Sequence, residues 1–195
     1  MEQGLSSMTI LAHELILGGA KSGKSRAAEA RAAAWLSGHP DHRATLVATA
    51  LAGDGEMAAR IARHRADRAA RVPALETVEA PQALGVALRR LSDPKRLLVV
   101  DCLTLWLTQC LLPSPGIVPP LPWPEEREAF IAALRDSSSP IVLVSNEIGL
   151  GVMPISPEAR CFLDTLGLLH QALAGHCRRV TLMLAGCELA VKDVP

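Results

Sequence analysis

The stretch that decides the fold is Gly18-Gly19-Ala20-Lys21-Ser22-Gly23-Lys24-Ser25, which fits the pattern G-x-x-x-x-G-K-[ST]. A short apolar run precedes it, and an Ala-rich stretch with helical spacing follows it. In this context the glycines let successive backbone N–H groups turn inward around phosphates, and the helix directs its positive end at them. Lys24 would reach the β- and γ-phosphates, and the Ser25 hydroxyl would bind Mg²⁺. A glycine-rich turn with a chance lysine would not explain spacing, order and context together, so we predict a nucleoside triphosphate site.

Short apolar runs alternate with helical stretches along the rest of the chain. Each run is too brief for a helix and lacks polar alternation, which is typical of strands buried on both faces of a parallel sheet. The runs are Leu15–Leu17, Ala44–Ala48, Leu97–Val100, Ile141–Val144 and Val180–Leu184. The helical stretches are Ser25–Leu36, Glu56–Arg71, Pro81–Leu91, Glu125–Leu134 and Pro157–Ala174. This order indicates βαβ crossovers and an α/β domain with a mostly parallel central sheet flanked by helices. We expect one domain over residues 13–195, after a loose extension over residues 1–12.

Composition excludes several classes of function. The 195 residues carry 20 Lys+Arg and 20 Asp+Glu, and aromatic residues make up only 3%. A neutral chain with few aromatic side chains is a poor candidate for binding nucleic acid by charge or by base stacking. The five cysteines are odd in number and form no C-x-x-C pair, which favours reduced thiols over a zinc site or a disulfide framework. Met8–Leu17 is too short to span a membrane and is a poor signal peptide. We expect a cytoplasmic protein.

Two further segments indicate a structural or functional role. Asp101 ends the apolar run Leu97–Val100, where a carboxylate commonly holds the Mg²⁺ shell or the nucleotide of such a site. It could instead, or in addition, cap a helix that begins at Leu103. Pro113–Pro124 contains six prolines in twelve residues, so it cannot be a helix or a central strand. We interpret it as an extended surface connection, either a plain loop or a lid or partner site.

The stretch Glu56–Arg71 places a histidine among cations. With 3.6 residues per turn, Arg60, His64 and Arg68 form a row at i, i+4 and i+8. Neighbouring cations disfavour the imidazolium and keep the ring neutral and nucleophilic, and the same arginines could hold phosphates. The alternative is a solvated basic helix face with an incidental histidine, and spacing alone does not decide between the two.

These residues carry a resemblance to a known family. The sequence resembles the bifunctional adenosylcobinamide kinase / adenosylcobinamide-phosphate guanylyltransferases of cobalamin (vitamin B12) synthesis, from about Leu15 to Ala190. The phosphate loop alone would name only a superfamily, whereas the histidine-helix and S-N-E-[IV]-G-x-G patterns in this order are far more specific. The matching segments are Leu17–Arg26, Ala48–Ala50, Asp54–Arg68 (D-x-E-M-x-x-R-I-x-x-H-R-x-x-R), Val100–Leu107 and Val144–Gly151.

The resemblance implies a RecA-like P-loop NTPase fold, a homotrimer and two reactions. Such enzymes phosphorylate the aminopropanol hydroxyl of the corrinoid adenosylcobinamide with ATP or GTP. They then transfer GMP from GTP, through a covalent histidine intermediate, to give adenosylcobinamide-GDP and pyrophosphate. Carried onto this sequence, His64 is the guanylylated residue. The implied nucleotide-binding residues are Gly18, Gly19, Ala20, Lys21, Ser22, Gly23, Lys24, Ser25, Thr49, Ala50, Leu51, Arg65, Ala66, Asp67, Arg68, Glu79 and Asp101. Mg²⁺ would be held by Ser25 and Asp101.

The sequence departs from the family pattern beyond Met153-Pro154. Ile155-Ser156 stand as an insertion, Cys161-Phe162-Leu163-Asp164 replaces R-F-R-D, and His170-Gln171 replaces Asn-Gln. These changes fall on the side expected to contact the corrinoid or another subunit. Glu147, in S-N-E-I-G, is a candidate base for the kinase reaction, and a helix-start or structural carboxylate is the alternative.

Two other functions stay open at this point. One is a P-loop kinase of small molecules that forms no guanylylated intermediate. The other is a GTP-binding regulatory module that has no corrinoid turnover, in which the pattern around His64 would have no role. If guanine binds here, the scarcity of aromatic residues predicts aliphatic and polar contacts to the base instead of ring stacking.

Overall fold

The structure is a computed structural model that describes residues 13–53, 55–113 and 122–194. The expected extension over residues 1–12 lies outside the described residues, as does most of the proline-rich segment Pro113–Pro124. Among the helices that are described, none combines the length and apolar character needed to cross a bilayer.

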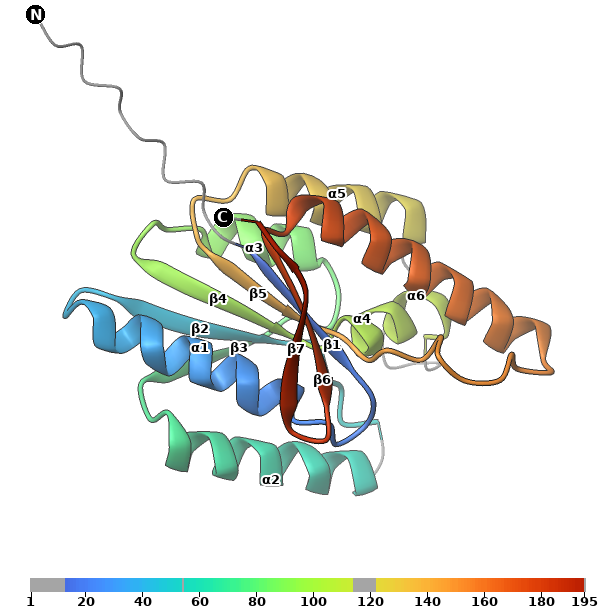
Figure 1. Ribbon diagram of the computed structural model, residues 1–195, viewed down its shortest axis with the longest axis horizontal. Coiled ribbons are helices and arrows are strands. Elements are labelled where there is room, and N and C mark those ends of the chain that lie inside the picture. Colours follow the sequence, from blue (N-terminus) through green and yellow to red (C-terminus); the bar gives the residue numbers. More distant parts are fainter. Residues whose placement is uncertain (1–12, 54, 114–121, 195) are drawn as a thin grey trace, which may run out of the picture.

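A seven-stranded sheet in the order β3-β2-β4-β5-β1-β6-β7 forms the centre of the molecule (Figure 1). Its strands are β1 (Glu14–Gly18), β2 (Arg43–Ala48), β3 (Leu75–Glu79), β4 (Arg96–Asp101), β5 (Ile141–Val144), β6 (Arg179–Leu184) and β7 (Cys187–Asp193). Every neighbouring pair is parallel except β6 and β7, which are antiparallel. The prediction of a mostly parallel sheet is therefore confirmed, and all five predicted strands are present.

Sequence reasoning missed β3 and β7, the two edge strands. Their sequences, LETVE and CELAVKD, are largely exposed, and the one apolar run between them is the exposed Leu189–Val191 of β7. An edge strand has a neighbour on one side only and is less completely covered, so the apolar signal of a buried strand is absent.

In the described part of the chain, six helices flank the sheet. They are α1 (Lys24–Gly38), α2 (Gly55–Arg71), α3 (Leu84–Leu91), α4 (Leu103–Leu111), α5 (Trp123–Arg135) and α6 (Pro157–His176). The helix expected from Pro81 begins instead at Leu84, because Ala83 adopts a left-handed backbone conformation (φ 52°) that cannot belong to a right-handed helix.

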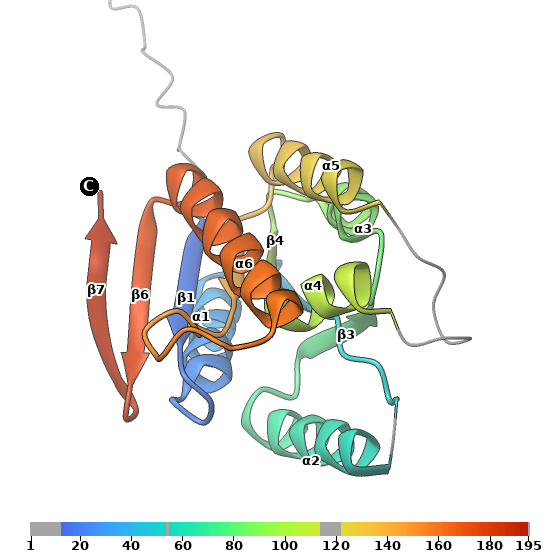
Figure 2. The same cartoon turned by 90° about the vertical axis from the view of Figure 1, so that its right-hand side faces the viewer.

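The helices divide between the two faces of the sheet (Figure 2). Alternate strand residues point to opposite faces, so Ile16 and Val99 join one core with α1, while Leu15 and Val100 join a larger core with α3, α4, α5 and α6. Trp106 and Phe130, both fully buried, pack against each other in the larger core with ring centroids 4.9 Å apart. Burial on both faces explains the unbroken apolar runs of β1, β4 and β5.

The register of the sheet brings the ends of three strands together. Val144, the last residue of β5, pairs with Ile16 of β1 on one side and with Asp101 of β4 on the other. Since the three strands are parallel, the phosphate loop after β1, the Asp101 carboxylate and the segment after β5 lie at the same edge of the sheet. The functional site is built at this edge.

Replacing Gly85 with alanine tests the closest helix contact. A Cβ at Gly85 would lie 2.5 Å from the Ala129 carbonyl oxygen of α5, a backbone atom that cannot move away alone. We expect Gly85→Ala to lower the free energy of unfolding by about 1–3 kcal/mol through overpacking. Gly167→Ala in α6, where nothing lies within 4 Å, is the control and should be neutral or stabilising by about 0.5–1 kcal/mol. Equal effects in denaturant titrations would contradict this account.

Candidate active site

The phosphate loop turns sharply between β1 and α1. A Cβ at Gly18 would lie 2.5 Å from the Met183 carbonyl oxygen of β6, so this position has room for glycine alone. Gly23 has φ 103°, a left-handed conformation at the N-cap of α1. The two glycines therefore let the backbone fold closely at the start of the helix, as the sequence pattern predicts.

Lys24 and Ser25 begin α1 and extend toward the loop and toward β4. Lys24 is a buried residue, and its ammonium donates a hydrogen bond to the Gly19 carbonyl at 2.6 Å, so it spans the loop. Burial lowers the pKa of Lys24, and the nearby Asp101 carboxylate opposes that shift. The Ser25 hydroxyl donates to Asp101 Oδ2 at 2.8 Å. These contacts place a cation, a hydroxyl and a carboxylate around one space.

Asp101 is the carboxylate of this site. Burial raises the pKa of its carboxyl group, while the Ser25 hydrogen bond and the charges of His64, Arg68 and Lys24 lower it. The N-cap of α4 is Cys102, and no side chain caps that helix. The side chain of Asp101 therefore bonds Ser25 and does not cap α4.

The Thr49 side chain connects the end of β2 to the end of β4 through two hydrogen bonds. Its fully buried hydroxyl donates to the Cys102 carbonyl at 2.7 Å and accepts from the Cys102 N–H at 2.8 Å. Both backbone groups of Cys102 thus find partners at the edge where the site lies. Ala50 and Leu51 follow and are half-buried. Nucleotide contact by these three residues stays a prediction.

The charged groups of the row predicted on α2 lie near enough to Lys24 and Asp101 to act on the pKa of those two groups. His64 and Arg68 both act through space on the carboxyl group of Asp101, and Arg60 acts on the ammonium of Lys24. The His64 side chain is nevertheless exposed, so its ring is accessible. The structure therefore places an accessible imidazole within electrostatic reach of the carboxylate.

Helix α2 is held mainly by charges. None of its residues is buried, and its last turn is tied by a bond from Arg71 Nε to Glu29 Oε2, 2.7 Å long. Arg65 forms an ion pair with Glu79, and Arg68 donates to the Thr77 hydroxyl at 3.3 Å. These bonds join α2 to β3 and to α1.

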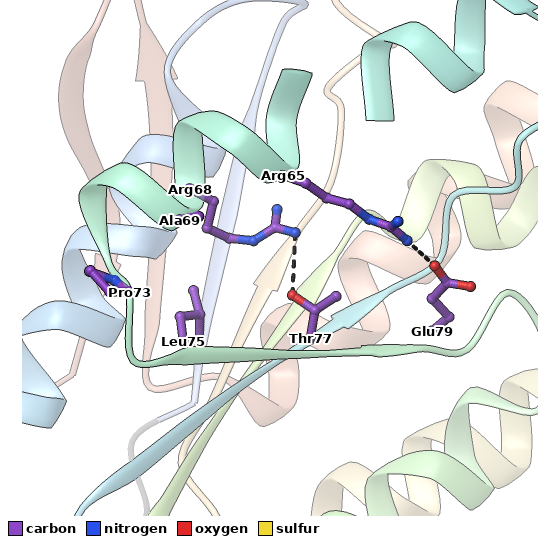
Figure 3. Close-up of a pocket in the computed structure, with 7 residues that line it drawn as sticks. All are labelled: Arg65, Arg68, Ala69, Pro73, Leu75, Thr77 and Glu79. Carbon is purple, nitrogen blue, oxygen red and sulfur yellow. Dashed lines mark hydrogen bonds and ion pairs between the residues drawn. The ribbon is translucent and has the colours of Figure 1, made fainter. Parts of the chain in front are cut away.

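A cavity of about 410 Å³ lies between α2 and β3 (Figure 3). Arg65 and Arg68 extend into it from α2, and Thr77 and Glu79 face them from β3. The remaining lining residues are aliphatic: Ala69, Pro73 and Leu75. The cavity thus combines polar groups with aliphatic walls and has no aromatic lining. Ala66 and Asp67, also expected at the nucleotide, are exposed on α2 and do not line it.

The departures from the family pattern have local explanations. The Ser156 hydroxyl accepts from the Ala159 N–H at 3.1 Å and so caps α6, and Ile155 before it is 95% exposed. Cys161 and Asp164 are exposed on α6, whereas His170 is buried against Ser145 at the end of β5. Sequence reasoning did not place His170 and Ser145 together, because no local pattern connects residues 25 positions apart.

Comparisons with known proteins agree with this geometry. A sequence model of the family described as "Cobinamide kinase / cobinamide phosphate guanyltransferase" matches residues 14–191. The chain is 48% identical over 182 residues to "Bifunctional adenosylcobalamin biosynthesis protein CobP" of Pseudomonas aeruginosa, covering 93% of this chain and 98% of that protein. It is 34% identical over 187 residues to "Bifunctional adenosylcobalamin biosynthesis protein CobU" of Escherichia coli, covering 91% and 98% respectively.

A solved structure supports the fold. The flagellar accessory protein FlaH of Methanocaldococcus jannaschii aligns with a TM-score of 0.51 at 12% identity, over 94% of this chain and 79% of that chain. This likeness concerns the fold alone. Together with the sheet order and the loop before α1, it confirms the predicted α/β fold of the P-loop, RecA-like class.

Substitutions of Thr49 test how much its hydrogen bonds to Cys102 stabilise the edge of the sheet at the site. Thr49→Val keeps the shape but leaves the buried Cys102 N–H without its partner, while the Cys102 carbonyl keeps the N–H of Trp106, so the free energy of unfolding should fall by about 1–3 kcal/mol. Thr49→Ser keeps the hydroxyl and is the matched control, expected to lose less. If chemical denaturation showed the serine variant to be the weaker of the two, methyl packing and not hydrogen bonding would dominate at this position.

Proposed function

Because the chain belongs to the cobinamide kinase / cobinamide phosphate guanyltransferase family and is a bifunctional enzyme of adenosylcobalamin biosynthesis, we propose that one nucleotide site serves both of its reactions. The first is transfer of the γ-phosphoryl group of ATP or GTP to the hydroxyl of adenosylcobinamide. The second is transfer of GMP from GTP to the resulting phosphate, with release of pyrophosphate. The observation that carries the proposal is the row Arg60, His64 and Arg68, which faces Lys24 and Asp101.

His64 is the nucleophile of the second reaction. A ring nitrogen of His64 attacks the α-phosphorus of GTP; the N–P bond forms, the bond from the α-phosphorus to the bridging oxygen breaks, and pyrophosphate leaves. A phosphate oxygen of the corrinoid then attacks the same phosphorus, the N–P bond breaks, and His64 is regenerated. Two successive displacements avoid aligning GTP and the corrinoid phosphate at once. The exposed position of His64 supports this role, because both partners must reach the ring.

Other histidines are engaged elsewhere in the fold. All six lie in the part of the chain that the structure describes. His42 stacks on Trp35 with ring centroids 3.9 Å apart, and its Nδ1 lies 2.7 Å from the Trp35 carbonyl oxygen. His170 is buried and bonded to Ser145. His64, by contrast, is exposed and lies near enough to Asp101 to lower the pKa of its carboxyl group.

Mg²⁺ fits the residues present. The Ser25 hydroxyl and the Asp101 carboxylate already lie 2.8 Å apart, and both are hard oxygen donors of the kind that Mg²⁺ prefers. Among the described residues no cluster of three or more His, Cys, Asp or Glu could hold a metal by itself, which agrees with an ion held partly by phosphates. Bound there, Mg²⁺ would supply charge neutralisation on the triphosphate. Lys24 adds a second positive charge next to the β- and γ-phosphates.

The cavity between α2 and β3 is assigned to the guanine base. The Glu79 carboxylate is suited to accept from the N1–H and N2–H₂ groups of guanine, which adenine lacks at those positions. Pro73 and Leu75 provide aliphatic walls for the ring. Arg65 and Arg68, which line the same cavity, continue toward the phosphates and would neutralise them.

Two broader properties complete the proposal. We place the enzyme in the cytoplasm, where free thiols persist, since all five cysteines are unpaired. We also propose a homotrimer that covers the exposed apolar side chains of the edge strand, Leu189 and Val191, which are 57% and 62% exposed. The natural substrate is the corrinoid that carries the free hydroxyl.

Covalent labelling tests His64 directly. Incubation with α-³²P-GTP and Mg²⁺ should label the wild-type protein through an acid-labile phosphoramidate bond, and chase with adenosylcobinamide-phosphate should move the label to a corrinoid product. His64→Ala should take up no label. His39→Ala, an exposed histidine near the end of α1, is the control and should label normally. Unchanged labelling of the His64 variant would assign the nucleophile to another residue.

Glu79→Gln tests the base site. Loss of the carboxylate removes a charged hydrogen-bond acceptor, worth about 1.5–3 kcal/mol, so the KM for GTP in the labelling reaction should rise roughly 10- to 100-fold. The KM for ATP in the kinase reaction should change far less. Glu76→Gln, on the same strand and also exposed, is the matched control. Equal changes in the KM of both nucleotides would place the base elsewhere.

A further inference from the structure

A chain of polar side chains lies behind the end of β5 and takes no part in the nucleotide contacts described above. Ser145 is fully buried, and its hydroxyl lies 2.7 Å from His170 Nε2 and 3.2 Å from the Thr104 hydroxyl. Thr104 also accepts from the backbone N–H of Asn146 at 2.9 Å. Helices α4 and α6 each contribute one member of this chain, so it ties both to β5.

This series of polar side chains ends at Glu147. His170 Nδ1 lies 3.9 Å from Glu147 Oε2, within the range of an ion pair. Burial lowers the pKa of His170, and the Glu147 charge opposes that shift. In the tautomer whose Nε2 accepts from the Ser145 hydroxyl, Nδ1 carries the proton and presents it to the carboxylate. The Gly149 N–H donates to the other oxygen, Glu147 Oε1, at 2.6 Å. The Gly149 hydrogen bond therefore fixes Oε1, while Oε2 is directed at the His170 ring from beyond hydrogen-bond distance.

Strand order places Glu147 between the two halves of the phosphate site. Strand β5 lies between β1 and β4, and its backbone continues along β1, since Ser145 N–H donates to the Ile16 carbonyl and Glu147 N–H to the Gly18 carbonyl, both at 3.0 Å. Glu147 thus stands beside the first residue of the phosphate loop. Its side chain is 23% exposed, so it remains accessible to a substrate.

The alternation of side chains puts Glu147 on the opposite face from the nucleotide groups. Val144 and Val99 belong to the core under α1, the face on which Asp101 bonds Ser25. Ser145 and Glu147 approach His170 of α6, which covers the other face. In phosphoryl transfer the attacking and leaving oxygens lie in line on opposite sides of the phosphorus. An acceptor on the Glu147 side would meet this requirement.

We propose that Glu147 is the general base of the kinase reaction and that His170 is its positioning residue. The carboxylate takes the proton of the corrinoid hydroxyl as the new O–P bond forms to the γ-phosphorus. The bond from that phosphorus to the β,γ-bridging oxygen breaks, and the nucleoside diphosphate leaves. This assignment rests on the proposed function, because it presumes the alcohol acceptor and the triphosphate site given there.

Glu147→Gln separates the two reactions. Loss of the base should lower kcat for phosphorylation of adenosylcobinamide by ATP by roughly 10²- to 10⁴-fold, with little change in the KM for the corrinoid. The same preparation should still take up α-³²P label from GTP, which also shows that it is folded. Glu158→Gln, an exposed carboxylate in the first turn of α6, is the matched control and should keep full kinase activity.

Variants of His170 test the positioning role. His170→Leu removes both ring nitrogens and should lower kinase kcat while leaving the KM for the corrinoid and the GTP label unchanged. His170→Gln can still contact Ser145 and should recover part of that kcat. A purely structural role would instead lower the melting temperature, the label and the kinase rate together, and would overturn the positioning role.

The outcomes distinguish this proposal from the one it rests on. If Glu147→Gln keeps its kinase kcat, or loses the label in parallel with the kinase activity, Glu147 is not the base. If the wild-type protein itself takes up no label from GTP, the covalent mechanism at His64 fails, whereas the kinase comparison between Glu147→Gln and Glu158→Gln still decides the role of Glu147.

Discussion

The hydrogen bond from the Ser25 hydroxyl to the Asp101 carboxylate is the contact on which the rest of the site depends. It joins the helix after β1 to the end of β4, two strands away in the sheet, and β5 lies between them. This geometry follows from parallel strands, whose carboxyl ends meet at one edge. A nucleotide held by the loop therefore has a cation, a hydroxyl and a carboxylate within reach, and the residues that follow β5 border the same space.

The two faces of the sheet present different side chains at the edge where the site lies. On the α1 face, α2 presents Arg60, His64 and Arg68 to the phosphate loop, and the cavity beside β3 lies next to this row. On the other face, the chain through Ser145 and His170 ends at Glu147.

The same division explains why α2 differs physically from the other helices. It contributes no buried residue and is tied down by Arg65, Arg68 and Arg71 through polar contacts. Exposed ion pairs of this kind stabilise by only about 0–1 kcal/mol each, and salt screens them. Helices α3 to α6, by contrast, bury Trp106, Phe130 and many leucines in the larger core. The helix that carries His64 is thus the one most weakly attached to the molecule.

The sequence by itself determined the phosphate loop, the five strands with continuous apolar runs and the mostly parallel sheet, because burial on both faces leaves a local signal in consecutive residues. It also determined that Arg60, His64 and Arg68 share one face of a helix, since that depends only on helical period. The edge strands β3 and β7 left no such signal. Only the tertiary structure decided that His64 and Arg68 lie near Asp101 and that Thr49 hydrogen-bonds to Cys102. It also decided that Ser145, His170 and Glu147 lie next to one another. Those contacts join residues that are distant in sequence, and strand order and helix packing bring them together.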